Sequence, residues 1–439
     1  MRRNFFFALV ISMAITALGQ VSPAPASPIT LEQAIVLARA NEPSFAAALA
    51  NQRVSGLDHS IAEAALLPSV TYHNSVLYTQ PNGSHNGGGP IGDQAAPRFI
   101  ANNAVREYAS QGVITETMGL QQVTAVSRAS AAQAVATAEL EIARRGLVNT
   151  VTSLFYQALA ADHKVGVAQR AAGEAAGFTN LTQQREGARE AAHADVVKAQ
   201  LQQQQRDRDL ADALLQQQKS RLDLGVLLFP DPRVGYTLAP GDVVPLPSRA
   251  DVDAAAMKLN PELHSALASL RVSSLDVTAA RAAYVPDLAL NFTYGIDAVQ
   301  FAANGRDGVR NLGYSVGATL DIPVWDWLST QHKVRQSEIL RDAAHTALTA
   351  AQRRLIAQLD ETYAEAGTSR DQLQSLDQSV QTATESLRLT RLRYSAGEAT
   401  VLEVVDAQNS LTSAEIARED GTIRYQLAFT NLQLLTGAI

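Results

Sequence analysis

The stretch PELHSALASLRVSSLDVTAARAAYVPDLALNFTYGI, residues 261–296, decides the fold. Its first part has no glycine, is rich in alanine and leucine, and predicts a helix from Glu262 to Tyr284 that ends before Pro286. Its second part alternates apolar residues with small or polar ones, which is the two-residue period of a strand. The apolar positions are Leu288, Leu290, Phe292, Tyr294 and Ile296. We therefore expect a helix that leads directly into a strand.

The same unit occurs once before in the chain. Pro43 and Pro68 precede Pro261 and Pro286 by the same distance, 261 − 43 = 286 − 68 = 218 residues, without a gap. The residues that recur unchanged 218 positions later are Leu49, Ala50, Arg53, Val54, Ser55, Leu57, Asp58, Ala62, Ala64 and Ala65. A shared register of this kind indicates an internal duplication, with helix, strand, strand and helical hairpin built twice.

Helices are expected over most of the chain, because proline is absent from long segments rich in alanine, glutamine, glutamate, arginine and leucine. The expected helices are 29–40, 44–67, 119–185, 194–228, 250–258, 262–284, 328–394 and 401–435. The expected strands are 70–78, 99–116, 287–298 and 311–322, with a flexible loop over 81–97. The predicted divisions are a signal peptide (1–26), a first repeat (27–228), a proline-rich connector (229–249) and a second repeat (250–439).

The N-terminus has the pattern of a secretory signal peptide. Arg2 and Arg3 precede an apolar run from Phe5 to Leu18. A membrane anchor is the alternative, but the run is short for a helix that spans a bilayer. Two pairs of small residues offer a cleavage site: Ala17 with Gly19, and Ala24 with Ala26.

Composition narrows the chemistry. The chain has no cysteine, so disulfides, thiol chemistry and lipid attachment at cysteine are excluded. Its formal net charge of −7 argues against a nucleic-acid partner. The eight histidines form no HxxxH or HExxH spacing, and neither GxGxxG nor a phosphate-binding loop occurs. We expect no metal, no cofactor and no catalysis.

The strands favour a membrane environment. In the last strand Leu312, Tyr314, Val316, Ala318 and Leu320 alternate with small or polar residues, and strands of about 10 residues with this pattern are typical of transmembrane strands. A soluble sandwich shows the same alternation. Four strands are too few to close a barrel, so several copies must contribute, and a trimer supplies twelve strands. The aromatic residues that fit a membrane interface, or packing between strand and helix, are Trp325, Trp327, Tyr72, Tyr78, Tyr284 and Tyr294.

Several motifs, taken together and in order, carry a resemblance. They are ITLEQAI (29–35), AALLPS (64–69) with its echo AAYVPD (282–287), DIPVWDW (321–327), RYSAGEATVLEVVDAQ (393–408) and NLQLLTG (431–437). With these motifs the chain resembles the TolC-like outer-membrane efflux protein family over nearly all of its length. The resemblance implies a mainly α fold with a small β part, in which a trimer forms a twelve-stranded β-barrel and an α-helical barrel. It also implies long coiled-coil hairpins and four transmembrane strands in each chain.

The resemblance implies a function as well. It is that of a trimeric outer-membrane exit duct of a tripartite efflux pump, which passes small toxic compounds from a periplasmic adaptor and an inner-membrane pump to the exterior. The implied periplasmic gate residues are Asp195, Tyr394, Glu403 and Asp406, and the implied adaptor-contacting turns are at Gly187 and Gly397. The implied membrane face, in contact with outer-membrane lipid, includes Tyr72, Leu290, Phe292, Tyr294, Tyr314 and Val316.

Some features depart from the family pattern, and alternatives stay open. Ala399 stands where some members carry a basic residue that latches the closed state. Without the resemblance, Asp195, Glu403 and Asp406 are ordinary solvated helix residues. A duct for type I protein secretion is one alternative function. A soluble periplasmic coiled-coil structural protein is another, from a different class.

Overall fold

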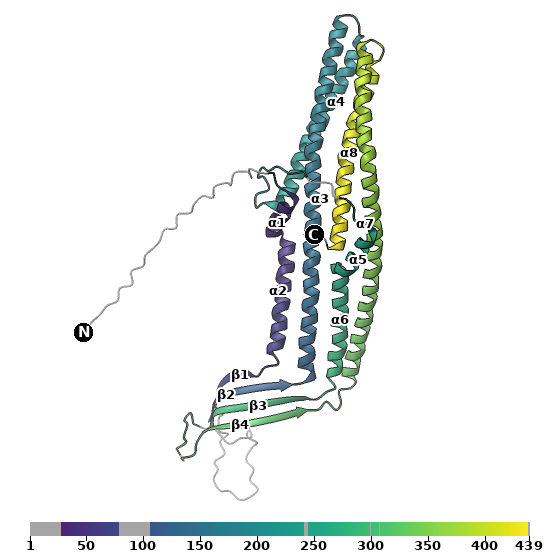
Figure 1. Cartoon of the computed structure of the whole chain (residues 1–439). Coiled ribbons are helices and arrows are strands. Elements are labelled where there is room, and N and C mark those ends of the chain that lie inside the picture. The colour runs from purple at the N-terminus through teal and green to yellow at the C-terminus, as the bar shows by residue number, and fades with distance from the viewer. Residues whose placement is uncertain (1–27, 79–105, 241–244, 299, 307, 438–439) are drawn as a thin grey trace, which may run out of the picture. The chain divides into compact units, whose positions relative to one another are not determined.

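The computed structural model describes residues 28–78, 106–240, 245–298, 300–306 and 308–437 (Figure 1). The first half contains α1 (Leu31–Asn41), α2 (Pro43–Ala64), β1 (Ser69–Tyr78), β2 (Arg106–Met118), α3 (Leu120–Gly187) and α4 (His193–Leu228). The second half contains α5 (Arg249–Leu259), α6 (Pro261–Ala282), β3 (Asp287–Ala298), β4 (Leu312–Asp321), α7 (Ser329–Ser395) and α8 (Val401–Thr436). The predicted signal peptide, the loop over 81–97 and the first residues of the predicted second strand lie outside the described residues.

The predicted duplication is confirmed by the order and length of the elements. α1 and α5 each have 11 residues, and α2 and α6 each have 22. α3 has 68 residues against 67 in α7, and α4 and α8 each have 36. The helix starts also correspond, because α2 and α6 both begin with proline, which suits the first helical position. The two halves are therefore one structural plan built twice.

The four strands form one antiparallel sheet in the order β1-β2-β3-β4 (Figure 1). Its register places Tyr72 opposite Gly112, Gly112 opposite Tyr294, and Tyr294 opposite Tyr314. Residues directly opposite one another share a face, so these aromatic residues lie in one row. The next row on that face consists of Val70, Ile114, Phe292 and Val316. The apolar residues of the predicted alternation therefore lie together on one face of the sheet.

This apolar face is largely uncovered. Tyr72 is 72% exposed and Tyr314 is 75% exposed. Ser110 interrupts the face, but its hydroxyl lies 2.7 Å from that of Tyr72 and donates to Asn74 at 2.8 Å. These hydrogen bonds give the buried hydroxyl of Ser110 partners within the sheet.

The chain groups into two compact units, each of which draws on both halves of the duplication. Among the described residues, unit 1 comprises 28–41, 151–240 and 379–420, and unit 2 comprises 42–78, 106–150, 245–298, 300–306, 308–378 and 421–437. In unit 1 a core around Phe178, Leu387 and Val404 joins the helices next to the two hairpin turns. In unit 2 the core gathers Val252, Leu355 and Leu432. The predicted domain boundaries, which follow the repeats, stay a prediction.

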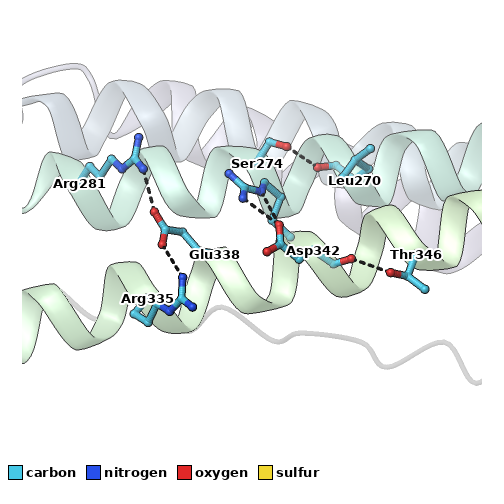
Figure 2. Close-up of polar contacts among 8 residues, drawn as sticks. Leu270, Ser274, Arg281, Arg335, Glu338, Asp342 and Thr346 are labelled. Atoms are coloured by element: carbon cyan, nitrogen blue, oxygen red, sulfur yellow. Dashed lines mark hydrogen bonds and ion pairs between the residues drawn. The ribbon is translucent and has the colours of Figure 1, made fainter.

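Ion pairs fix α6 against α7 in unit 2. The Nη2 atom of Arg281 donates to Oε1 of Glu338 at 2.8 Å, and Nη1 of Arg335 donates to Oε2 at 3.4 Å (Figure 2). The hydrogen bond from Arg281 is the main cause of a lowered pKa at Glu338. Glu338 is therefore ionised at neutral pH and is held by one arginine from each helix. Among the residues that the structure describes, no helix combines the length and the apolar character that crossing a bilayer needs.

Candidate functional site: the hairpin turns

The turn between α3 and α4 lies in unit 1 and closes the first hairpin. The amide of Glu190 donates to the carbonyl of Arg185 at 2.7 Å, and the amide of Arg189 donates to the carbonyl of Glu186 at 2.8 Å. Arg189 has a φ of 62°. This pair of hydrogen bonds around a left-handed residue is the Schellman motif, which satisfies the last carbonyls of a helix.

The turn between α7 and α8 is built in the same way. The amide of Glu398 donates to the carbonyl of Arg393 at 2.8 Å, and that of Gly397 donates to the carbonyl of Tyr394 at 3.0 Å. Gly397 has a φ of 80°, a conformation that glycine adopts without the steric cost of a Cβ. Arg189 in the first turn thus corresponds to Gly397 in the second.

This correspondence differs from the sequence prediction, which matched Gly187 with Gly397. Gly187 is instead the last residue of α3, and the left-handed position of the first turn belongs to Arg189. The offset between the turns is 397 − 189 = 208 residues, and the same offset relates Asp195 to Glu403. Both acidic residues lie in the first turn of the returning helix, where a negative charge interacts favourably with the helix dipole.

Thr400 and Glu403 form a capping box at the start of α8. The amide of Glu403 donates to Oγ1 of Thr400 at 3.3 Å, while the amide of Thr400 donates to Oε1 of Glu403 at 3.1 Å. Arg393 Nη1 donates to Oε2 of Glu403 at 3.3 Å. The hydrogen bond from the Thr400 amide is the largest cause of a lowered pKa at Glu403, and Arg393 adds to it. The carboxylate is therefore ionised and held in place at the turn.

Tyr394 lies inside unit 1 and only 5% of it is exposed. Its ring contacts Phe178 of α3 edge to face, with centroids 5.1 Å apart. Its hydroxyl donates to Oγ1 of Thr182 at 3.4 Å. The sequence predicted Tyr394 as a gate residue, and the structure places it between the two hairpins rather than on an open surface.

Arg185 completes this contact, and the sequence analysis missed it. Its Nη1 donates to the carbonyl of Tyr394, its guanidinium lies 4.9 Å from the centroid of the Tyr394 ring, and its Nε is 3.5 Å from Oε2 of Glu190. We call Phe178, Thr182, Arg185 and Tyr394 the turn cluster. The available signal was a basic residue in the last turn of a helix, where it can hydrogen-bond terminal carbonyls. That signal does not reveal a partner on another hairpin.

The other predicted acidic residues lie nearer to solvent. Asp406 is exposed on α8, on the side opposite to the buried residues Val404 and Ala407. Asp195 is half-buried at the start of α4. Within the described part of the chain, neither carboxylate is within ion-pair distance of a basic side chain. Their charges are therefore available to solutes and ions.

The predicted membrane-face residues Tyr72, Leu290, Phe292, Tyr294, Tyr314 and Val316 share one face of the sheet. Trp325 and Trp327 follow β4, are 67% and 82% exposed, and contact each other with ring centroids 5.7 Å apart. Trp327 and Leu328 both have positive φ, 56° and 64°, before α7 begins. In the described residues no three histidine or acidic side chains gather as ligands for a metal ion.

The chain is similar in sequence to several known outer-membrane proteins and similar in fold to solved structures. The outer membrane efflux protein family matches residues 254–438. The outer membrane protein OprJ of Pseudomonas aeruginosa is 27% identical over 172 residues, which is 39% of this chain and 36% of OprJ, so the match spans little more than a third of that relative. The pyoverdine export outer membrane protein OpmQ of Pseudomonas putida is 26% identical over 410 residues, 91% of this chain and 83% of OpmQ.

Among solved structures, the outer membrane protein VceC of Vibrio cholerae matches with a TM-score of 0.79 at 16% identity, covering 93% of this chain and 96% of VceC. This likeness confirms the predicted fold of long helical hairpins with a small sheet. The matched proteins are outer-membrane channels and export proteins rather than enzymes, and the chain is an outer-membrane protein. Its sequence and fold are similar to those of the TolC-like outer membrane efflux protein family, whose model matches residues 254–438.

Proposed function

We propose that three copies of the chain form an outer-membrane channel that serves as the exit duct of a tripartite efflux pump. A periplasmic adaptor and an inner-membrane pump are its proposed partners, and small toxic compounds are its proposed cargo. The observation that carries this proposal is the four-stranded sheet, which has an uncovered apolar face and two open edges.

The sheet is incomplete on its own. β1 and β4 each have a neighbour on one side only, and the open side presents unpaired backbone groups. Within a membrane such groups need partners, because the hydrocarbon offers none. Edge-to-edge pairing of β1 with β4 of the next copy supplies them, and three copies join twelve strands into one closed sheet. The face with Tyr72, Phe292 and Tyr314 then meets lipid.

Helix α2 supports the same assembly. Val54, Leu57 and Ile61 are spaced by three and four residues, so they form one stripe on the helix. They are 56%, 64% and 66% exposed. A stripe of this kind on a helix needs a partner surface, and a second copy of the chain provides one. Burial of these side chains would stabilise the trimer by the hydrophobic effect.

The proposed narrow end is at the hairpin turns. Three copies would place Asp195, Glu403 and Asp406 around one axis, and a ring of carboxylates in a narrow passage concentrates cations. The turn cluster holds the second hairpin to the first through Arg185 and Tyr394. Opening of the passage would require this contact to break. The adaptor is proposed to act at the exposed turns around Arg189 and Gly397.

Planar-bilayer recordings test the proposal. In the variant Glu403→Gln/Asp406→Asn we expect cation selectivity to fall, and block by a trivalent cation added on the side of the turns to weaken at least tenfold. Glu63→Gln, which removes one exposed carboxylate from α2 on the side away from Val54, is the control and should leave both properties unchanged. Equal block in the wild type and the double variant would remove these carboxylates from the passage.

Cell fractionation tests the assembly directly. We expect the protein in the detergent-extracted outer-membrane fraction as a trimer that migrates as a monomer on gels only after heating. Recovery as a monomer without detergent would refute the channel.

A further inference from the structure

Three ion pairs join α3 to α8 within unit 1. His163 Nδ1 lies 2.8 Å from Oε2 of Glu419, Lys164 Nζ lies 2.6 Å from Oδ1 of Asp420, and Arg170 Nη2 lies 3.0 Å from Oε1 of Glu415. We call these three pairs the α3–α8 seam. Because α3 belongs to the first half of the duplication and α8 to the second, the seam connects the two hairpins.

The other charges around His163 are largely paired. On α3, Asp162 binds Arg221 of α4 through Nη2 and Oδ2 at 2.8 Å. On α8, Arg418 Nη1 lies 3.8 Å from Oε1 of Glu419. The remaining charged groups on these facing segments are the other members of the seam. On α4, which packs beside them, Arg206 Nη1 lies 3.0 Å from Oδ2 of Asp209. His163 is thus the one group of the seam whose charge changes between about pH 5 and 8.

Packing beside the seam is incomplete. A cavity of about 180 Å³ lies between α3, α4 and α8. Lys164, Val167, Ala168 and Ala171 of α3 line it together with Thr412 and Ile416 of α8. Helices that meet across a void forgo part of their dispersion contacts. The charged pairs of the seam therefore add to a contact between α3 and α8 that side-chain packing leaves incomplete at this level.

We propose that His163 and Glu419 make the α3–α8 seam sensitive to pH, so that the proton on His163 tightens the seam and its loss loosens it. The other two carboxylates of the seam, Asp420 and Glu415, are paired with lysine and arginine, which stay charged between about pH 5 and 8. These two pairs therefore persist over that pH range. Loss of the proton from His163 therefore weakens one ion pair in each chain. It loosens the contact between the two hairpins only near His163 and Glu419.

The titration has the sign that this proposal requires. The hydrogen bond with Glu419 is the largest cause of a raised pKa at His163, against the opposing effect of burial. His163 in turn is the largest cause of a lowered pKa at Glu419. Because the pKa of His163 is above its ordinary value of 6.5 in the folded protein, the stabilisation is complete below pH 6.5 and is lost as pH rises through the raised value.

Hydrogen–deuterium exchange of the full-length protein in detergent tests the proposal, with uptake corrected for the intrinsic effect of pH. In the wild type we expect exchange of the α8 segment 412–424 to accelerate about two- to fivefold between pH 5.5 and 8.5, the scale of a partly exposed ion pair. His163→Arg keeps the charge and should exchange slowly at both pH values. His163→Gln removes the charge and should exchange fast at both.

A matched control is available in the same unit. His193 lies 2.8 Å from Glu186 at the first turn, so His193→Gln removes a histidine–carboxylate pair without touching α8, and it should keep the wild-type pH response. Identical pH responses in the wild type, His163→Arg and His163→Gln would overturn the proposal. The readout requires no conductance, so a protein that fails as a channel still tests the seam.

Discussion

Replacing Arg185 by leucine should release the second hairpin turn from α3. Arg185 donates to the carbonyl of Tyr394, and its guanidinium lies 4.9 Å from the centroid of the Tyr394 ring. Leucine keeps the aliphatic part of the side chain and removes both interactions. The carbonyl of Tyr394, in the last turn of α7, then keeps only the amide of Gly397 as a donor.

The magnitude follows from these two contacts. A hydrogen bond from a charged group contributes about 1.5–3 kcal/mol, and a cation–π contact contributes about 0.5–1 kcal/mol. Together they amount to about 2–4 kcal/mol in the free energy of opening the turn cluster. Since about 1.4 kcal/mol corresponds to a factor of ten, the open population should rise roughly 30- to 700-fold.

Limited proteolysis measures this population. Trypsin cleaves after Arg393, whose side chain is exposed in the last turn of α7, but cleavage requires the helical backbone there to unfold locally. In the regime where opening is faster than cleavage, the cleavage rate follows the open population, so it should rise by the same factor in Arg185→Leu. Arg189→Asn is the control: it removes a basic residue from the first turn, tolerates the positive φ, and should leave cleavage after Arg393 unchanged. A rate within twofold of the wild type in Arg185→Leu would refute the reasoning.

Two further predictions concern stability and assembly. Arg145→Met should lower the unfolding temperature by several degrees in a detergent melt followed by circular dichroism. The buried Arg145 donates to carbonyls at the ends of α8 (2.6 Å) and α5 (2.9 Å), and each such hydrogen bond contributes about 1.5–3 kcal/mol. Arg144→Met should have a smaller effect, and an equal effect would contradict this role of Arg145. Leu57→Asp/Ile61→Asp should weaken the trimer at least tenfold in analytical ultracentrifugation, since both side chains lie exposed on one stripe of α2. Glu63→Ala, on the opposite side of α2, should not weaken it. An unchanged trimer in the double variant would exclude that stripe from the interface.

Local chemistry made the strand and helix boundaries predictable. Pro68 and Pro286 stop a helical pattern and precede an alternating one, so the starts of β1 and β3 follow from sequence. β2 was harder, because Ser110 and Glu116 lie on its apolar face and hide the alternation. The hydroxyl of Ser110 is satisfied by partners on β1, 36 and 38 residues away, and no local pattern contains that information.

The turns show a second limit. A glycine near the end of a helical pattern is the usual signal for a left-handed residue, and Gly397 follows it. In the first hairpin the signal misleads, because Gly187 is helical and Arg189 takes the left-handed conformation. The φ of Arg189 and the pair of hydrogen bonds from Arg189 and Glu190 reveal this. Counted from Gly187, Asp195 lies 195 − 187 = 8 residues after the glycine, against 403 − 397 = 6 for Glu403 after Gly397. Counted from Arg189, the distance is 195 − 189 = 6, and the two hairpins agree.

The corrected register separates the roles of the two hairpins. With an offset of 208 residues, Asp195 corresponds to Glu403, but Lys198 corresponds to Asp406. Each first hairpin therefore carries one acidic and one basic residue at these positions, whereas each second hairpin carries two acidic ones. An attraction for cations at the turns should come mainly from the second hairpin, so Asp195→Asn alone should change cation block much less than Glu403→Gln/Asp406→Asn. The duplication supplied two equivalent turns, and substitution at a few positions made one of them the acidic one.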